Sequence, residues 1–516
     1  MVLIFDTETT GLPKKWNAPL SDSENWPRCV QIAWQIHDFS GECIENRSYL
    51  IKPEGYTIPY EAEKIHGIST SLANLKGEKI NKVLNTFLDS LSKCKYICGH
   101  NVTFDINIIG AELFRIGQEN KIDQFSVIDT CSEITAEITK LPGGRGGKFK
   151  FPTLSELYFN LFNENFLEAH NATADVEATS RCLIELFRRN IFRNDFVEGI
   201  DQIQNKIQEQ FNDIIPLLGL KHESFKLASE KLKSKEENSK SIPLKEDLDS
   251  SITDNKSFSH LHVHSQFSIL QSTSKISNLV SKAIDYKMPA IALTDHGNLM
   301  GSFRLIKEVK NYNNNILEDR DKIKPIIGCE FFVCEDHLDK TRRNDGYQIV
   351  FLAKSKKGYD NLSKMSSISF KEGFYYVPRI DKGIVEKYKE DIIVLTGNLY
   401  GEVPSKILNI GLKQGEESLL WWKNNFGDDL YIEIMRHSQD DEDAVNESLI
   451  SLSKKHKISL VATNNTYYTE KSQANAHDIL LCVKDGEKQI TPIGKGRGFR
   501  YGLMNQEYYF KSQEEM

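Results

Sequence analysis

The chain has 516 residues, a formal net charge of −8 and 39% hydrophobic residues. At roughly 150 residues for each domain, this length predicts about three domains and excludes a single small one. The charged residues make up 27% of the chain, which is typical of a globular protein, and the net negative charge excludes the strongly basic composition of many nucleic-acid-binding chains. A local basic patch is still compatible with nucleic-acid binding.

Residues 1–190 alternate between strand-like and helix-like patterns. Short apolar runs rich in Val, Ile and aromatic residues predict strands, and apolar residues three and four positions apart predict helices. The alternation predicts an α/β domain with a mixed sheet and flanking helices. The expected strands are 2–5, 29–37, 44–51 and 96–98, and the expected helices are 80–91, 105–116 and 172–189.

Residues 191–257 are expected to form a helical and charged linker. Apolar residues at helical spacing predict a connecting helix within 196–220. Serine and charged residues dominate 221–256, and such a composition buries too little apolar surface to offset the entropy lost on ordering. Residues 210–215 faintly resemble a sliding-clamp peptide, although an amphipathic helix is the better explanation of the same pattern.

Residues 258–516 return to the alternation of strands and helices. A helical pattern at 276–284 precedes a strand at 289–293, and polar residues follow directly at the end of that strand. The recurrence of strand, polar tip and helix predicts a (β/α) barrel-like domain with its site at the carboxyl ends of the strands. The further expected strands are 325–327, 349–353, 392–395, 430–434 and 460–463.

Two carboxylates stand at the end of the first expected strand. Asp6 and Glu8 are alternate residues, so both side chains point to the same face. Like charges in this position favour a cation between them, and oxygen ligands suit Mg²⁺ or Mn²⁺. Taken alone, the pair is explained more simply by a strand end with two solvated acids.

Later motifs complete the pattern of the first region. Residues 6–12 read DTETTGL, residues 65–68 read IHGI, residues 99–105 read GHNVTFD and residues 170–175 read HNATAD. In this order the motifs resemble the DEDDh exonucleases, the family of the proofreading subunit of bacterial replicases. The resemblance covers residues 1–190 and implies a ribonuclease H-like fold.

The resemblance to DEDDh exonucleases implies a two-metal site that removes single nucleotides from DNA 3′ ends. His170 would act as the general base on the attacking water, and His66 and Phe104 would line the pocket for the terminal base. The implied ligands of two Mg²⁺ or Mn²⁺ ions are Asp6, Glu8, Asp105 and Asp175.

The second region opens with alternating histidines. His260, His262 and His264 would share one face of a strand. Imidazoles in this arrangement suit zinc or manganese. A polar strand edge is an equally good explanation of this motif alone.

Five motifs of residues 258–516 together resemble the N-terminal part of bacterial DNA polymerase III alpha subunits. That part carries a polymerase and histidinol phosphatase (PHP) domain. The motifs are HLHVHS (260–265), ALTDHGNLMG (292–301), IKPIIGCEFFV (323–333), NAHDILLCVKDGE (475–487) and QEYYFKSQEEM (506–516).

The metal positions of the PHP family are only partly matched. The matching residues are His262, His264, Asp295, His296, Glu330 and His437. Neutral residues stand at the other positions, namely Gln271, Gln348, Asn398, Asn465 and Tyr467. Because amides and phenols are poor ligands for a three-metal site, we expect a degenerate, mainly structural PHP domain whose metal is absent or partial.

The two resemblances predict the N-terminal portion of a replicative DNA polymerase III alpha subunit whose fused exonuclease proofreads. No polymerase carboxylate triad is recognised in 258–516, so the chain is expected to be either a fragment of a longer polymerase or a truncated gene product, without a polymerase active site of its own. The expected partners are the DNA primer 3′ end and a C-terminal polymerase core, with a sliding clamp and other replisome subunits as further candidates. One alternative is an active PHP phosphoesterase with a separate repair exonuclease, and another is a non-catalytic interaction module.

The nine cysteines include no CxxC pair, which favours reduced thiols. The N-terminus lacks the basic region of a signal peptide, and no apolar run approaches the roughly 18 residues of a membrane span. The sequence therefore predicts a cytoplasmic protein without a membrane segment.

Overall fold

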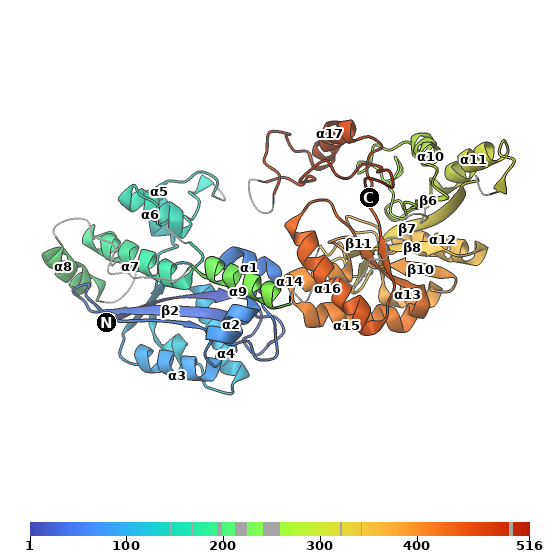
Figure 1. Ribbon diagram of the computed structural model, residues 1–516. Helices are drawn as coiled ribbons and strands as arrows, with labels where there is room; N and C mark the ends of the chain where they lie inside the picture. The colour runs from blue at the N-terminus through green and yellow to red at the C-terminus, as the bar shows by residue number, and fades with distance from the viewer. Residues whose placement is uncertain are drawn as a thin grey trace. The chain divides into compact units, whose positions relative to one another are not determined.

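The computed structural model divides the chain into two compact units, Met1–Ile242 and Pro243–Met516 (Figure 1). Each unit is described by itself. The boundaries expected at 190 and 258 stay predictions. The structure describes residues 1–144, 147–166, 169–192, 199–211, 224–240, 258–319, 322–341, 343–494 and 499–516.

Unit 1 is built on a mixed sheet, as the sequence predicts. Among the described residues the sheet has five strands in the order β3-β2-β1-β4-β5. The β1–β2 and β2–β3 pairs are antiparallel, whereas β1–β4 and β4–β5 are parallel. The strands are β1 (Val2–Thr9), β2 (Cys29–His37), β3 (Cys43–Leu50), β4 (Tyr96–Gly99) and β5 (Ser126–Asp129).

The first strand is longer than the sequence predicts. The expected strand ends at residue 5, but β1 continues to Thr9 because its later residues still pair with β2. Asp6 and Glu8 therefore lie within the central strand of the sheet, where pairing with β2 fixes their position, since the pairing with β4 covers only Val2–Ile4.

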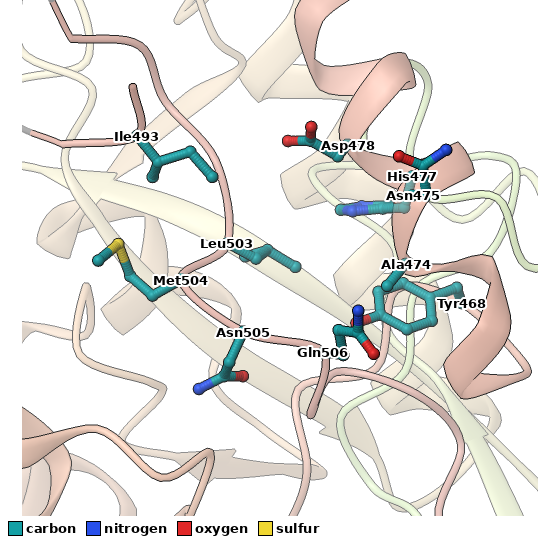
Figure 2. A pocket seen from close by; sticks show the side chains of 10 residues that line it. All are labelled: Tyr468, Ala474, Asn475, His477, Asp478, Ile493, Leu503, Met504, Asn505 and Gln506. Atoms are coloured by element: carbon teal, nitrogen blue, oxygen red, sulfur yellow. The ribbon is translucent and has the colours of Figure 1, made fainter. Parts of the chain in front are cut away.

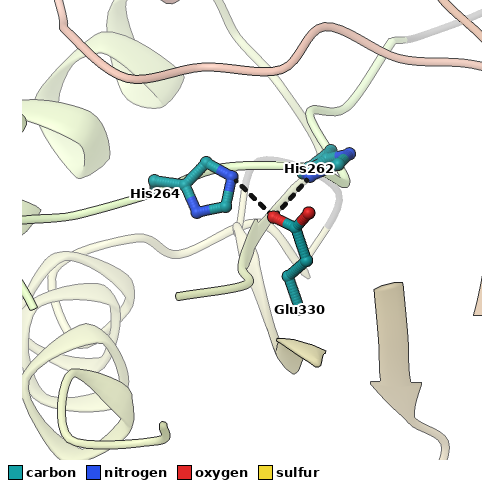
Figure 3. Close-up of side chains that lie close together, drawn as sticks. All are labelled: His262, His264 and Glu330. Carbon is teal, nitrogen blue, oxygen red and sulfur yellow. Dashed lines mark hydrogen bonds and ion pairs between the residues drawn. The ribbon is translucent and has the colours of Figure 1, made fainter. Parts of the chain in front are cut away.

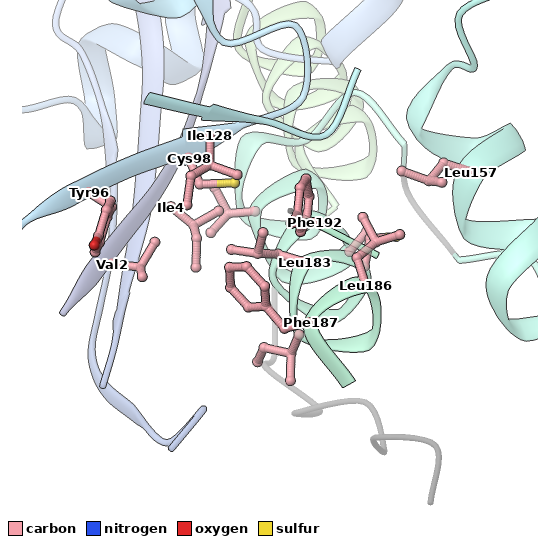
Figure 4. Close-up of a cluster of buried hydrophobic side chains, with 14 of the residues drawn as sticks. Val2, Ile4, Tyr96, Cys98, Ile128, Leu157, Leu183, Leu186, Phe187 and Phe192 are labelled. Carbon is pink, nitrogen blue, oxygen red and sulfur yellow. The ribbon is translucent and has the colours of Figure 1, made fainter. Parts of the chain in front are cut away.

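The two faces of the central strand enter separate hydrophobic cores. Val2 and Ile4 join one cluster with residues of α7 (Ala172–Arg188), which Figure 4 shows at close range. Leu3 and Phe5 join the other cluster with residues of α3 (Ile80–Leu91) and α4 (Thr103–Arg115). This alternation follows from the two-residue period of a strand and explains why both faces are covered by helices.

The remaining helices of unit 1 include two from the stretch expected to be a linker. Helix α8 (Ile200–Gln210) packs on α7, and α9 (Phe225–Lys240) packs on α2 (Thr70–Lys76). Residues 212–223 and 241–257 lie outside the described residues, as does most of the clamp-like sequence at 210–215. The other elements are α1 (Tyr60–His66), η1 (Ile122–Gln124), α5 (Glu133–Thr139) and α6 (Leu154–Phe162).

Unit 2 contains a curved mixed sheet that matches the predicted barrel-like class. As far as the chain is described, its main path runs β12-β11-β10-β8-β7-β6, and β9 pairs with β7. The strands are β6 (Ala290–Leu293), β7 (Lys324–Cys334), β8 (Tyr347–Ala353), β9 (Arg379–Asp381), β10 (Ile392–Leu395), β11 (Leu430–Ile434) and β12 (Leu460–Ala462).

The histidine-rich segment at 260–264 bridges the two ends of this sheet. The Ala292 amide of β6 donates to the His260 carbonyl, and the His264 amide donates to the Thr466 carbonyl beyond β12. The segment forms an isolated bridge at Val263 and not the regular strand that the alternation predicts. It therefore joins the sheet ends and carries its histidines into the interior.

Helices surround the sheet of unit 2. None of the helices in the described ranges is long and apolar enough to cross a membrane. The helices are α10 (Ile276–Asp285), α11 (Ser302–Asn313), α12 (Lys356–Lys371), α13 (Lys382–Tyr388), α14 (Glu402–Asn409), α15 (Leu412–Phe426), η5 (Gly427–Asp429), α16 (Asp440–His456), η6 (Lys471–Gln473) and α17 (Ala474–Asp485).

Candidate functional site

Three of the predicted carboxylates of unit 1 meet at one point. Donor oxygens of Asp6, Glu8 and Asp175 lie within 4.8 Å of one another, a spacing that can hold a metal ion. Asp6 and Glu8 come from alternate positions of β1, and Asp175 comes from the first turn of α7. The sequence separation of more than 160 residues is closed because α7 packs on β1 and β2.

The fourth predicted carboxylate lies beside this group and is held by the intervening residue of β1. Asp105 Oδ1 accepts hydrogen bonds from the Thr7 amide at 2.9 Å and from Thr7 Oγ1 at 2.6 Å. Asp105 stands in the first turn of α4, where the helix N-terminus favours a negative charge. The two bonds fix the orientation of a side chain that is almost completely buried.

The carboxylates repel one another. Burial first, and then the charges of Asp105, Asp175 and Glu8, raise the pKa of Asp6 well above its usual range. The pKa of Glu8 is raised in the same way, and burial raises the pKa values of Asp105 and Asp175 to about 7. Oxygen donors whose mutual repulsion a cation would relieve are suited to hard divalent ions.

The N-terminus of α7 is anchored to the sheet by a buried glutamine that the sequence did not indicate. Gln31 of β2 accepts from the Ala172 amide at 3.1 Å and donates to Asn171 Oδ1 at 3.2 Å. Asn171 in turn caps the helix by accepting from the Thr173 amide. These bonds fix the turn of α7 from which Asp175 projects.

His170 lies at the rim of the carboxylate group. Its backbone has a φ of 69°, a left-handed conformation that is uncommon for a residue with a side chain. Its amide donates to Asp175 Oδ2 at 3.1 Å, and the residue is exposed. The turn therefore holds the His170 backbone against Asp175 and leaves the residue open to solvent.

His66 stands at the C-terminus of α1 and is buried. Burial lowers its pKa to about 4, and the Thr9 backbone and His170 are the neighbours that affect it next. Its Nδ1 accepts from the Ile68 amide at 3.1 Å, so the neutral ring carries its proton on Nε2. The residue predicted to line the substrate pocket is thus next to the carboxylate group and presents an N–H donor.

An exposed tryptophan near the site escaped the sequence analysis. The ring of Trp16 is 57% exposed and lies 5.8 Å from the ring of Phe104, the residue that precedes Asp105. The Trp16 loop is held by Asn25, whose side chain bonds the amide and the carbonyl of Lys15. The sequence did contain a signal for this residue, because a large aromatic side chain in a polar loop is typical of a binding surface.

The predicted histidine site of unit 2 converges on one carboxylate oxygen. His262 Nε2 and His264 Nε2 each lie 3.1 Å from Glu330 Oε2, and Figure 3 shows both rings turned toward it. His296 Nδ1 lies 3.3 Å from the same oxygen. The side chains of His262, His264 and Glu330 are completely buried.

A second glutamate, which the sequence analysis missed, also contacts this cluster. Glu433 Oε1 of β11 lies 2.9 Å from His262 Nδ1, so His262 bridges two carboxylates. Burial alone would lower the pKa of His262, but Glu433 and Glu330 raise it to about 10. Burial likewise would raise the pKa of Glu330, but His296 and His262 hold it well below its usual range. A glutamate within the apolar run of β11 was the signal for this partner.

The other predicted residues of unit 2 point elsewhere. Asp295 accepts from the Ser265 amide and hydroxyl and from Ser268 Oγ, and His437 Nδ1 pairs with Glu442 at 2.6 Å. His260, expected to share a face with His262 and His264, bonds the Lys511 carbonyl instead. The irregular backbone of 260–264 breaks the two-residue period on which that expectation rests.

Four of the neutral residues at the replaced metal positions make hydrogen bonds or ring contacts within the region. Asn398 Nδ2 donates to Gln348 Oε1 at 3.0 Å. Asn465 Oδ1 lies 3.0 Å from His264 Nε2, and the ring of Tyr467 stacks on that of His264 with centroids 4.6 Å apart. These hydrogen bonds and ring contacts occupy groups that a multi-metal site would need free.

The last described segment of the chain covers the same region. Tyr508 stacks on His437 with ring centroids 4.1 Å apart, and Asn505 Nδ2 donates to the His437 carbonyl. The cavity that remains is only about 80 Å³, and its lining includes Asn398, Asn465 and Tyr467. A phosphoester substrate would have to displace part of this cover.

A separate cavity of about 260 Å³ lies between α17 and residues 503–506 (Figure 2). Two of its polar side chains are already engaged, because His477 bonds the Gln271 carbonyl and Asp478 pairs with Arg500. It contains none of the predicted site residues.

Comparisons with known proteins agree with this division. Residues 3–183 match the family model described as Exonuclease, and residues 260–437 match the model described as PHP domain. The chain therefore combines an exonuclease domain, which supports nuclease activity, with a PHP domain.

The chain is also similar to curated proteins named DNA polymerase III subunit alpha. The relative from Borreliella burgdorferi is 40% identical over 263 residues, covering 50% of this chain and 22% of that protein. The relative from Aquifex aeolicus is 36% identical over 271 residues, covering 51% and 22%. The chain thus covers about a fifth of the length of these relatives.

One of the matching solved structures is that of E. coli exonuclease I in complex with a dA16 oligonucleotide. It is 25% identical, covers 36% of this chain and 40% of the other, and has a TM-score of 0.29.

Proposed function

We propose that this chain is the N-terminal portion of a replicative DNA polymerase III alpha subunit. In this proposal unit 1 is a 3′→5′ DNA exonuclease that removes mismatched primer ends, and unit 2 is a mainly structural PHP domain. The observation that carries the proposal is the convergence of Asp6, Glu8 and Asp175, with Asp105 beside them, in a domain that matches the exonuclease family. The polymerase core, a sliding clamp, other replisome subunits and a cytoplasmic location belong to the same proposal.

The residues of unit 1 fit a pair of divalent cations, because the oxygen donors of Asp6, Glu8 and Asp175 converge there with Asp105 beside them, and the pKa values of all four carboxylates are raised. Asp6, Glu8, Asp105 and Asp175 would hold two Mg²⁺ or Mn²⁺ ions. When bound, such ions activate water and neutralise the charge of the scissile phosphate.

The chain's own residues supply the remaining parts of the reaction. His170, exposed at the rim and tied to Asp175, takes the proton of the attacking water at its imidazole. His66 donates its Nε2 proton to the terminal nucleotide. The Phe104 and Trp16 rings provide an apolar wall on which bases stack.

The decisive assay uses a 5′-labelled primer with a mismatched 3′ end. We expect the wild-type chain to shorten the primer one nucleotide at a time in the presence of Mg²⁺ or Mn²⁺. Asp6→Ala should slow this by at least about a thousandfold and His170→Ala by at least about a hundredfold, whereas His262→Ala should leave the rate unchanged. An all-RNA primer and a 3′-blocked primer test the substrate and the direction of cleavage.

If only the His262 variant lost nuclease activity, the assignment of that activity to unit 1 would be contradicted. The rival proposal, an active PHP phosphoesterase with a separate repair exonuclease, rests on the spacing of His262, His264 and Glu330. It predicts stoichiometric zinc or manganese that survives Asp6→Ala but not His262→Ala. Metal analysis of the two purified variants separates the proposals.

A further inference from the structure

Helix α9, from the stretch expected to be a linker, is docked on the exonuclease unit. Phe225 is 9% exposed and packs with Ala228 and Leu232 against a cluster that includes Ile68 and Leu72. The cluster is separate from the two main cores on the faces of the sheet. The helix therefore has an apolar face that matches a specific surface of unit 1.

A buried serine of α9 is bonded to the turn that follows His66. Ser229 Oγ donates to the Gly67 carbonyl at 2.8 Å and accepts from the Ser69 amide at 3.1 Å. Ser229 and Ser69 are 3% and 4% exposed, so water does not compete freely for these bonds. One side chain thus satisfies two backbone groups of the turn, about 160 residues away in sequence.

The backbone of α9 also lies against the turn itself. Gly67 has a φ of 75°, and a Cβ atom built there would lie 2.6 Å from the Lys226 nitrogen. A glycine is needed at this position both for the left-handed conformation and for the close approach of α9. The fit leaves no room for the turn to move toward α9.

The same turn fixes the ring of His66. The Ile68 amide donates to His66 Nδ1, so the turn sets both the tautomer and the direction of Nε2. His66 Nε2 is buried, and the Thr9 backbone and His170 are the neighbours that act on the ring. A displacement of residues 66–69 would therefore move a donor that faces the site.

We propose that α9 completes the exonuclease: Ser229 is a positioning residue that holds the 66–69 turn, so substrate binding depends on the docking of a helix encoded between the two expected domains. This inference rests on the proposed nuclease function. It assigns the stretch 224–232 to the nuclease itself and not to a passive tether.

The test compares variants of the full chain on the mismatched primer. Ser229→Ala should raise KM about fivefold with little change in kcat, because the turn loses the hydrogen bonds that hold it, whose net contribution is about that of one hydrogen bond. Phe225→Ala should do the same by loosening the packing of α9 while leaving both hydrogen bonds of Ser229 chemically possible. Leu227→Ala is the matched control, because Leu227 is 57% exposed on the same helix and should change neither constant.

A double-mutant cycle distinguishes positioning from general destabilisation. If Ser229 acts through His66, Ser229→Ala should add nothing to the KM of His66→Ala. An equal effect in both backgrounds, or an unchanged KM in Ser229→Ala and Phe225→Ala, would overturn the coupling while leaving the nuclease intact. A wild-type chain that fails to cut, as Asp6→Ala should, would overturn the proposed function instead.

Discussion

The two units gather metal-ligand side chains in opposite electrostatic settings. In unit 1, Asp6 is surrounded by Glu8, Asp105 and Asp175, and each of these charges disfavours its ionised form. In unit 2, the His262 imidazole lies between Glu330 and Glu433 and supplies the positive charge from within. Ligand-type residues at the right spacing are therefore insufficient to assign a metal site. The charge balance of the group decides whether a cation is needed.

The two sites also differ in access. Asp6, Glu8 and Asp175 are only partly buried, and His170 is exposed beside them. His262, His264 and Glu330 are completely buried, and the neighbouring His437 is covered by Tyr508. The end of a substrate strand can reach the site of unit 1 directly, whereas the site of unit 2 is enclosed in the interior of the domain. Breaking each arrangement should therefore have a different consequence.

The largest expected effect is on the stability of unit 2. His262→Asn leaves Glu330 and Glu433 buried without their cation, and breaking such a buried pair costs about 3–5 kcal/mol. Because the folded-state pKa of His262 is raised to about 10, its contribution is complete below about pH 6.5 and is lost as pH rises toward 10. The difference in unfolding free energy between wild type and variant should shrink over that range, as measured by denaturant unfolding.

His260→Asn is the matched control for this comparison. His260 is also buried on the same segment, but burial lowers its pKa to about 4, so it stays neutral above pH 7. Its effect on stability should not depend on pH between about 7 and 10. A His262 variant that shows the same pH-independent loss would mean that no internal cation balances the cluster.

The next effect is the response of unit 1 to divalent metal. A metal ion at a concentration a hundredfold above its Kd raises the free energy of unfolding by about 2.7 kcal/mol. This corresponds to a rise in Tm of roughly 5–10 °C for a unit of this size. In the metal-free protein Asp105 and Asp175 have pKa values raised to about 7, so stability falls as pH rises from about 4 to 7. The metal must displace these protons, and the rise in Tm should therefore grow over the same range.

Calorimetry with EDTA or Mg²⁺ at about pH 5.5 and about pH 8 measures this response. Asp6→Asn keeps the size of the side chain but removes a ligand, so it should abolish most of the rise. A metal response that is equally large in Asp6→Asn, or that is lost in His262→Asn, would place the cation in unit 2 and reverse the comparison.

The smallest effect concerns the access of substrate to unit 1. Trp16→Ala should raise KM for a single-stranded 3′ end about tenfold, because base–aromatic stacking contributes about 1–3 kcal/mol. Trp16→Phe should lose much less. Oligonucleotide binding in the absence of metal should quench the fluorescence of Trp16. The fluorescence of Trp26, which is only 3% exposed, should not change. Equal KM values for the two variants would remove Trp16 from the substrate surface.

Much of the fold was predictable because hydrophobic periodicity is local. The apolar runs at 29–37 and 96–98 predicted β2 and β4, and the spacing in 80–91 predicted α3. The extension of β1 to Thr9 was not predictable, because polar residues continue the strand only where β2 pairs with them. The docking of α9 was missed for a similar reason: its few apolar residues matter only against the surface of α2.

The candidate site of unit 1 was predictable from motifs, since each carboxylate stands within a short stretch of sequence that resembles the exonuclease family. Gln31 and Trp16 were not, because their roles depend on contacts with residues far along the chain. In unit 2 the list of histidines came from the sequence, but Glu433 and the diversion of His260, Asp295 and His437 to other partners did not. Those pairings are set by how the strands meet.

The sequence by itself determined the two modules, the acidic set of unit 1 and the loss of ligand residues in unit 2, because residue types and their local spacing carry that information. Only the tertiary structure decided which of these groups face one another. It placed Asp6, Glu8 and Asp175 together with Asp105 beside them, and it placed His262 between two glutamates. The physical reason is that Coulomb interactions and burial depend on distances between residues far apart in sequence, which the sheet pairings and helix docking fix.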